Sequence, residues 1–207
     1  MVILQGENGF LYLNMFNEVD SHISRCAPFS SSELEKFHSK LKPKTFKKKT
    51  LLLQQGEVCK FEAYIIKGCV KKYYIDADGE EVILQFAVED WWISDIGSFS
   101  EQKPSNLFIE TLEDTEVLMI DFESKEQLFK EVPTLERVFR IMIQRAYSVL
   151  ENRFYATVAR PAEERYLEFL EKYPTIPQRV PQQQIASYLG ITPESLSRIK
   201  SKLLKRD

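Results

Sequence analysis

The C-terminal stretch VPQQQIASYLGITPESLSRIKSKLLKR, residues Val180–Arg206, has the pattern of two short helices joined by a tight turn. Ile185 and Leu189 are four residues apart and therefore share one face of the first helix. Gly190 can adopt the left-handed backbone conformation that ends a helix. Thr192, which precedes a proline, supplies a hydroxyl N-cap at the start of the second helix. The stretch is therefore predicted to be a helix-turn-helix.

The second of these helices has one apolar face and one polar, basic face. Leu196, Ile199 and Leu203 recur at spacings of three and four residues and are expected to point inward. The polar face carries Glu194, Ser195, Arg198, Ser201 and Lys205. A polar and basic face of this kind suits the major groove of DNA. A structural helical hairpin is the alternative.

Charge is distributed unevenly along the 207 residues, whose formal net charge is −3. Residues 160–207 hold nine Lys and Arg against six Asp and Glu, whereas residues 1–159 hold nineteen against twenty-five. The positive charge is concentrated around the predicted helix-turn-helix, as phosphate binding requires. The length is sufficient for one large domain or two modest ones.

Short apolar runs rich in β-branched and aromatic residues fill the chain from about residue 44 to residue 121. They are TLLLQ, FEAYIIKG, CVKKYYI, EVILQFAV and VLMID, with turn sequences between them. The pair Asp78-Gly79 is a strong hairpin signal. No helical pattern interrupts the runs, so we expect an antiparallel barrel or jelly roll.

A long helix is predicted from Pro133 to about Thr157, and it carries two apolar stripes. The first alternates steps of four and three like a coiled-coil seam and consists of Leu135, Phe139, Met142, Ala146 and Val149. The second consists of Ile143, Tyr147, Leu150 and Phe154. One stripe is needed for the protein's own core, and we assign the first stripe to a homodimer seam. The alternative is a helix buried on both sides within the monomer.

The order helix, antiparallel barrel, long helix, supporting helix and helix-turn-helix resembles the Crp–Fnr family of bacterial transcription regulators. The segment QIASYLGITPESLSRIK carries the most specific part of the resemblance. The resemblance implies an α+β protein with a jelly-roll sensor, a dimerisation helix and a small DNA-binding domain. We expect a peripheral extension at 1–14, an effector domain at 15–132, the dimerisation helix and hinge at 133–159, and the helix-turn-helix domain at 160–207.

The resemblance also implies the partners and the DNA-contacting residues. The partners are a near-palindromic double-stranded DNA site with half-sites about 34 Å apart, a second copy of the chain, and RNA polymerase. The residues expected to read bases are Glu194, Ser195 and Arg198. The residues expected to contact phosphates are Thr192, Lys200, Lys202 and Lys205.

The expected effector pocket departs from relatives that bind cyclic AMP. Those relatives carry Gly-Glu-Leu and, after a short helix, an arginine that holds the phosphate. Here the stretch DWWISDIGSFSEQKPSN offers Asp95 in place of the glutamate and no arginine. A buried phosphate without a fixed cation is poorly compensated, so we expect that cyclic AMP is not the effector. The candidate pocket residues are Trp92, Ser94, Asp95, Lys103 and Ser105.

Other functional classes have little support in the residues. The two histidines, His22 and His38, precede the strands, so a barrel metal site lacks ligands. There is no G-x-S-x-G motif and no phosphate-binding glycine loop, and the three cysteines lack C-x-x-C spacing. We expect a cytoplasmic protein that is not an enzyme and has no membrane span, metal or cofactor. These residues do not identify its effector. The alternative function is a binding module that acts through protein partners.

Overall fold

The structure is a computed structural model that describes residues 7–205. The first helices are α1 (Glu7–Ser24) and α2 (Ser31–Lys40). The strands are β1 (Lys42–Phe46), β2 (Leu51–Leu53), β3 (Glu62–Lys67), β4 (Val70–Ile75), β5 (Glu81–Ala87), β6 (Trp92–Ile93), β7 (Phe108–Thr111) and β8 (Thr115–Ile120). The later helices are α3 (Ile96–Glu101), α4 (Phe122–Glu131), α5 (Pro133–Ala159), α6 (Ala162–Lys172), α7 (Ile176–Arg179), α8 (Gln182–Leu189) and α9 (Pro193–Leu203).

The strands form two antiparallel four-stranded sheets, in the orders β1-β8-β3-β6 and β2-β7-β4-β5. This arrangement confirms the expected antiparallel jelly roll and the α+β class. The hairpin predicted at Asp78-Gly79 joins β4 to β5, and Gly79 has a φ of 83°, which glycine adopts without strain. Apolar residues of both sheets, including Ile65, Ile109 and Val117, fill the space between them.

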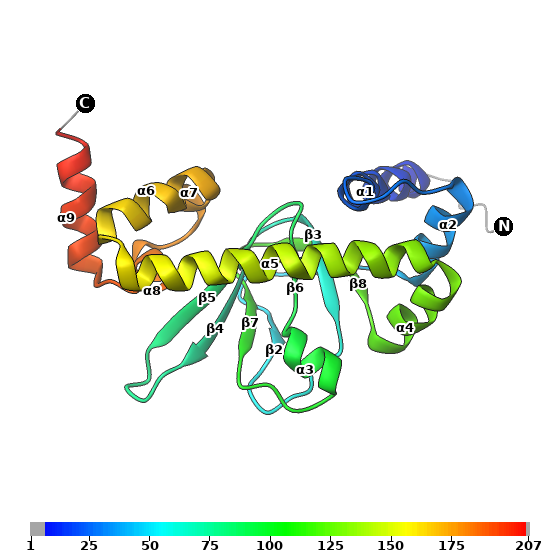
Figure 1. The fold of residues 1–207 in the computed structure, drawn as a ribbon, viewed down its shortest axis with the longest axis horizontal. Helices are drawn as coiled ribbons and strands as arrows, with labels where there is room; N and C mark the ends of the chain where they lie inside the picture. Colours follow the sequence, from blue (N-terminus) through cyan, green and yellow to red (C-terminus); the bar gives the residue numbers. More distant parts are fainter. Residues whose placement is uncertain (1–6, 206–207) are drawn as a thin grey trace.

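Strand β8 is apolar along most of its length because both of its faces are covered. Val117 and Met119 point into the barrel, whereas Leu118 and Ile120 point to the opposite side and pack against helices. Helices α1, α2 and α4 and the first half of α5 provide this outer layer. Figure 1 shows these helices gathered at one end of α5.

Helix α5 has 27 residues, corresponding to about 40 Å, and links the two ends of the molecule. In Figure 1 it runs from α1, α2 and α4 at one end to α6–α9 at the other. Its predicted start at Pro133 is confirmed, and it continues two residues beyond the predicted end. Helix α5 ends at Ala159, and the extended residue Arg160 follows it.

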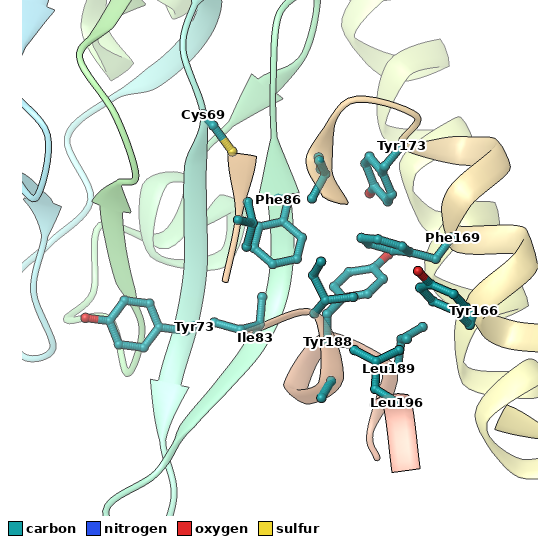
Figure 2. Close-up of a cluster of buried hydrophobic side chains, with 14 residues drawn as sticks. Cys69, Tyr73, Ile83, Phe86, Tyr166, Phe169, Tyr173, Tyr188, Leu189 and Leu196 are labelled. Atoms are coloured by element: carbon teal, nitrogen blue, oxygen red, sulfur yellow. The ribbon is translucent and has the colours of Figure 1, made fainter. Parts of the chain in front are cut away.

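The C-terminal helices dock against the outer face of β4 and β5. Figure 2 shows Phe86 from β5 facing Phe169 from α6, with Tyr188 of α8 beside them. The Phe86 ring centroid lies 6.4 Å from that of Phe169 and 5.5 Å from that of Tyr188. The barrel and the C-terminal domain therefore share one hydrophobic core.

Polar contacts surround this shared core. The Arg179 guanidinium donates two hydrogen bonds to the Glu89 carboxylate, at 2.8 and 2.9 Å, and also pairs with Glu113. Ser187 Oγ accepts from the Ile83 amide at 3.0 Å and donates to the Glu81 carbonyl at 2.7 Å. These contacts fix the position of the C-terminal domain on the barrel.

The N-terminal end consists of two helices. Helix α1 runs without a break across residues 14 and 15, where the expected extension meets the effector domain, and residues 1–6 of that extension lie outside the described residues. Ser30 and Glu33 form a capping box at the start of α2.

Candidate nucleic-acid interface and effector pocket

Helices α8 and α9 form the predicted helix-turn-helix. Gly190 ends α8 with a φ of 65°, and the Ile191 amide after it donates to the Ala186 carbonyl at 3.0 Å. Thr192 Oγ1 accepts a hydrogen bond from the Ser195 amide at 3.2 Å and caps α9, as expected. Leu196 is buried against the core of the C-terminal domain, so the opposite side of α9 faces outward.

The outward side of α9 forms a shallow basic hollow of about 460 Å³. It is lined by Ser197, Arg198, Ser201, Lys202 and Lys205. Of these residues, Ser197 and Ser201 were not among the expected DNA contacts, although the four-residue spacing between them places both on one side of α9. Figure 1 shows α9 at the far end of the molecule, away from the barrel. The major groove of a DNA duplex could therefore approach this side of α9 without a clash with the barrel.

The residues expected to read bases lie together at the start of α9. Arg198 donates to Ser195 Oγ at 3.1 Å, which places the guanidinium beside the first turn. Glu194 is exposed, and hydrogen bonds from its own amide and from the Thr192 hydroxyl lower the pKa of its carboxyl. The three side chains therefore offer two acceptors and one bidentate donor at the helix end that usually enters the major groove.

The residues expected to contact phosphates divide into two groups. Lys205 is exposed, whereas Lys200 is only half-exposed. The Lys202 ammonium lies 2.5 Å from a Glu163 carboxylate oxygen of α6, so this cation already joins two helices of the domain. Among the expected phosphate contacts, Lys205 is thus the lysine whose charge is most available to a phosphate.

The expected effector residues Ser94, Asp95 and Ser105 meet at the start of α3, where their side chains are held by other groups of the protein. Asp95 Oδ1 caps α3 by accepting from the Ser98 amide at 3.3 Å, and its Oδ2 accepts from Ser105 Oγ at 2.6 Å. Ser94 Oγ donates to the Phe61 carbonyl at 2.9 Å. The carboxylate that would stand for the family's glutamate is therefore satisfied by the protein itself.

The other two expected pocket residues lie elsewhere. The Lys103 side chain is 73% exposed and pairs with Glu101 at 2.7 Å, so it does not point into the barrel. Trp92 packs among the helices outside the barrel, with its ring centroid 5.6 Å from Tyr64 and 5.4 Å from Phe139. Both assignments are corrected. Alternation along a strand places neighbouring residues such as Trp91 and Trp92 on opposite faces, but it does not say which face is the pocket.

A cation that the sequence analysis missed lies among these residues. Lys72 of β4 donates from Nζ to the Ser94 carbonyl at 2.9 Å. Burial lowers the pKa of Lys72, while the nearby Asp95 carboxylate acts in the opposite sense. Lys72 belongs to a different strand from the stretch DWWISDIGSFSEQKPSN, so that stretch gives no sign of it. The alternation of β4 places Lys72 and Lys71 on opposite faces, but it does not say which of the two enters the barrel.

The expected dimer seam on α5 is divided by the structure. Leu135 and Phe139 are buried in the core beside α4, so they are unavailable to a second copy, and this part of the assignment is corrected. Met142 is half-buried, Ala146 is exposed and Val149 is 42% exposed. The most exposed apolar residues of α5 are instead Tyr147, Leu150, Phe154, Tyr155 and Val158. Three of them, Tyr147, Leu150 and Phe154, belong to the second predicted stripe, which had not been assigned to the dimer seam.

Within the described residues, no helix combines the length and the apolar character needed to cross a membrane. No group of three or more His, Cys, Asp or Glu side chains in the same part of the chain is arranged to hold a metal ion.

A jelly roll followed by a long helix and a C-terminal helix-turn-helix defines a class of sensor-linked regulators. Residues 43–132 match the family model of the cyclic nucleotide-binding domain. The chain is 28% identical over 108 residues to the cAMP-activated global transcriptional regulator CRP of Salmonella typhimurium, a match that covers 52% of this chain and 51% of that protein. The chain thus matches about half the length of this relative.

A longer match is found with the fumarate and nitrate reduction regulatory protein of Vibrio cholerae, at 26% identity over 203 residues, covering 91% of this chain and 80% of that protein. Among solved structures, the c-di-GMP responsive regulator CLP of Xanthomonas campestris superposes with a TM-score of 0.69 at 18% identity, covering 86% of this chain and 93% of that one. FixK2 of Bradyrhizobium japonicum superposes with a TM-score of 0.69 at 19% identity, covering 80% of this chain and 85% of FixK2. The chain carries a cyclic nucleotide-binding domain and is homologous to the Crp–Fnr transcription regulators.

Proposed function

We propose that the protein is a homodimeric transcription regulator that binds a near-palindromic DNA site through α9. The observation that carries the proposal is the outward side of α9, where Arg198 and Lys205 stand in a hollow otherwise lined by small serines and Lys202. Small serines let the helix approach base edges closely, and arginine can donate two hydrogen bonds to guanine. The basic balance of residues 160–207 supports the same partner.

A gel-shift series tests how α9 contacts DNA, using a duplex selected from a random pool. Arg198→Ala is expected to weaken binding to the selected duplex by about 1–3 kcal/mol per half-site and to change random DNA much less. Lys205→Ala is expected to weaken both duplexes alike and to reduce the salt dependence, because it removes a phosphate contact. Equal losses on both duplexes for Arg198→Ala would show that Arg198 does not read bases.

The proposed dimer uses the exposed apolar side of α5. Tyr147, Leu150, Phe154 and Val158 are between 59% and 76% exposed, and they follow one another at spacings of three and four residues. A long exposed apolar stripe on a helix is typical of an interface. A second copy in two-fold symmetry would cover it, and the two α9 helices would then read two half-sites about 34 Å apart. Contact of the DNA-bound dimer with RNA polymerase is part of the same proposal.

We further propose that cyclic AMP is not the effector. The Asp95 carboxylate is held by Ser98 and Ser105, and the buried cation next to it, Lys72, is held by a main-chain carbonyl. A cyclic phosphate would have to displace these internal bonds and take Lys72 in place of an arginine. Because a lysine offers a point charge and no two-pronged donor, binding of the cyclic phosphate is expected to be weak.

Calorimetric titration with cyclic AMP and cyclic GMP tests this second proposal. No saturable binding below about 100 μM is expected, which corresponds to less than roughly 5.5 kcal/mol of binding free energy. The informative variant is Lys72→Gln, with exposed Lys103→Gln as its matched control. Micromolar binding that Lys72→Gln abolishes and Lys103→Gln leaves intact would mean that Lys72 binds the cyclic phosphate in place of the missing arginine.

A further inference from the structure

A second cleft lies at the junction of the two domains, outside the barrel. It is formed by the last turns of α5, by α6 and by the end of α8, and its volume is about 240 Å³. This is slightly below the roughly 300–1,000 Å³ of typical small-molecule sites, so it suits a small ligand. The lining includes Arg153, Arg165, Glu168, Phe169, Lys172 and Tyr188.

The cleft has an excess of positive charge. Arg153, Arg165 and Lys172 line it, and the one carboxylate in the lining is Glu168. That carboxylate is already paired with Arg160. The three lining cations therefore have no carboxylate partner within the cleft, which creates a positive potential in a partly enclosed space.

Two of these cations differ in their surroundings: Arg165 has a buried donor without an acceptor, and the half-buried Lys172 contacts ring faces. Arg165 donates from one terminal nitrogen to the Thr157 carbonyl at 3.2 Å, but its buried Nε has no acceptor in the described structure. Lys172 Nζ lies 5.4 Å from the ring centroid of Trp91 and 5.0 Å from that of Tyr173, and these ring faces are its contacts among the described residues. A buried donor without an acceptor is costly, so Arg165 favours an anion nearby, and the half-buried Lys172 ammonium adds positive charge at the same place.

The third cation holds the walls in place. Arg153 donates to the carbonyls of Ile83 and Leu84 in β5 and, at 2.9 Å, to the Tyr188 carbonyl of α8. Its guanidinium carbon also lies 4.0 Å from the Tyr188 ring centroid. Arg153 thus links the strand β5 of the barrel to α8 of the C-terminal domain. Its terminal nitrogens already donate to protein carbonyls, so it adds positive charge to the cleft without directing these donors at a ligand.

The remaining walls are apolar and aromatic, including Phe169 and Tyr188. A bare inorganic ion would leave these surfaces uncovered, whereas an organic body would bury them. We propose that this cleft binds a small organic anion, with its carboxylate or phosphate group at Arg165 and Lys172 and its apolar body against Phe169 and Tyr188. No part of the barrel interior contributes to the site, so it is separate from the effector pocket of the jelly roll.

The site stays accessible in the proposed dimer. Ala156 lines the cleft and follows Phe154 by two residues, which is a rotation of about 200° around the helix axis. The exposed stripe of Phe154 and Val158 therefore lies on the opposite side of α5. A second copy packed on that stripe leaves the cleft open to solvent.

Occupancy of the cleft would act on the junction between sensor and DNA-binding domain. The anion would contact α6 and α8, which belong to the DNA-binding domain, while the α5 lining residues Asn152 and Ala156 would form the wall of the cleft on the sensor side. A ligand that binds only while the two domains are docked stabilises the docked arrangement by mass action. The cleft is thus placed to sense a small anion independently of the barrel.

Titration of the full-length protein with benzoate and with phenyl phosphate tests the proposal, followed by calorimetry and by tyrosine-ring NMR shifts. The neutral matched probe is benzyl alcohol, and inorganic phosphate reports on the anionic group alone. Saturable binding of at least one organic anion, with weaker binding of benzyl alcohol and inorganic phosphate, is the expected result. Preference for benzoate would identify a carboxylate ligand, and preference for phenyl phosphate would identify a phosphate ligand.

Variants localise the binding. Arg165→Gln and Lys172→Gln are each expected to weaken the preferred anion about tenfold, because each removes a charge-assisted hydrogen bond. The matched controls Arg140→Gln, on the exposed N-terminal part of α5, and Lys103→Gln should bind as the unchanged protein does. The two cleft variants are read separately, so a folding defect in one leaves the other informative.

The pH profile separates a direct contact from a structural effect. Burial and the nearby Arg153 guanidinium lower the pKa of Lys172 to about 8, while Arg165, Glu168 and the tyrosine hydroxyls line the same cleft. Affinity should therefore fall as the pH rises from 7 to 9.5, and this fall should be absent in Lys172→Gln. Failure of both organic anions to bind at millimolar concentration, or unchanged binding in both cleft variants, would overturn the proposal.

Discussion

The two outer faces of the barrel are covered in different ways. The sheet β1-β8-β3-β6 is covered by α1, α2, α4 and the first half of α5, through a cluster built mainly of aliphatic side chains and phenylalanine. The sheet containing β4 and β5 is covered by the C-terminal domain, through a cluster that includes Tyr73, Tyr166, Tyr173 and Tyr188. Ion pairs lie in both interfaces, Arg179–Glu89 in the second and Arg25–Asp90 in the first, so the two differ mainly in their tyrosine content. A tyrosine-rich cluster is more polar than an aliphatic one, as is typical of domains that can separate, whereas an aliphatic cluster is typical of a permanent core.

Helix α5 belongs to both faces and shows the same difference along one element. Its first half contributes Leu135, Val138 and Phe139 to the aliphatic core. In its second half Arg153 and Ala156 face the protein, while Phe154 and Val158 are largely exposed. The same apolar periodicity thus produces buried core residues in the first half of α5 and exposed apolar residues in the second half.

The largest expected effect comes from a matched pair of phenylalanines on α5. Phe139→Ala should lower the free energy of unfolding by about 3–5 kcal/mol, because the ring is buried among Trp92, Phe129 and the Lys125 ammonium. Phe154→Ala should change the stability of the monomer by about 0.5 kcal/mol or less, because its ring is 74% exposed. Urea unfolding at low protein concentration measures both. Equal losses would contradict the distinction between the two halves of α5.

A smaller effect is expected from a charge on the exposed stripe. Phe154→Glu should weaken self-association about 100-fold, or roughly 2.7 kcal/mol, because a dimer would have to bury an unpaired carboxylate. Sedimentation across a concentration series measures the shift. Glu136→Gln, an exposed change near the start of α5, is the control and should leave association unchanged. A wild-type protein that is monomeric at micromolar concentration would refute the dimer itself.

The smallest expected effect concerns the ion pair that docks the C-terminal domain. Burial alone would raise the pKa of Glu89, but hydrogen bonds from Arg179 and from the Gly68 amide outweigh it and hold that pKa below its usual value of 4.5. A carboxyl with a lowered folded-state pKa stabilises the fold above about pH 4.5, and this contribution is lost as the pH falls through the folded-state pKa.

Arg179→Gln should therefore cost about 1 kcal/mol at pH 7, a modest amount because the Glu89 side chain is 43% exposed. The difference in Tm from the unchanged protein should shrink as the pH is lowered toward 3. Thermal unfolding between pH 7 and pH 3 measures it, with Arg140→Gln as the control. A difference that stays constant over this range would mean that the pairing with Glu89 contributes nothing.

Much of the architecture could be predicted from short segments. The Gly190 turn, the Thr192 cap and the apolar face of Leu196 are local features, and each appears in the structure as expected. The β4–β5 hairpin at Asp78-Gly79 was predictable for the same reason. Helix caps and tight turns depend on residues within four or five positions, so a sequence pattern specifies them.

The candidate effector site was predicted less completely because its residues come from distant strands. Asp95 and Ser105 were expected together and do meet, since both belong to the α3 segment. Lys72 reaches the same place from β4, and no sequence spacing connects it with Ser94. Trp92 was misplaced because alternation along a strand assigns a residue to one of two faces without naming either.

The sequence by itself determined the element types, the helix-turn-helix and the concentration of basic charge at the C-terminal end, because these depend on propensity, periodicity and composition. The tertiary structure decided which stripe of α5 is buried, which cation enters the barrel, and how Arg153, Arg165 and Lys172 come to share one cleft. Periodicity identifies a face of a helix, but the partner of that face is set by the packing of segments far apart in the chain.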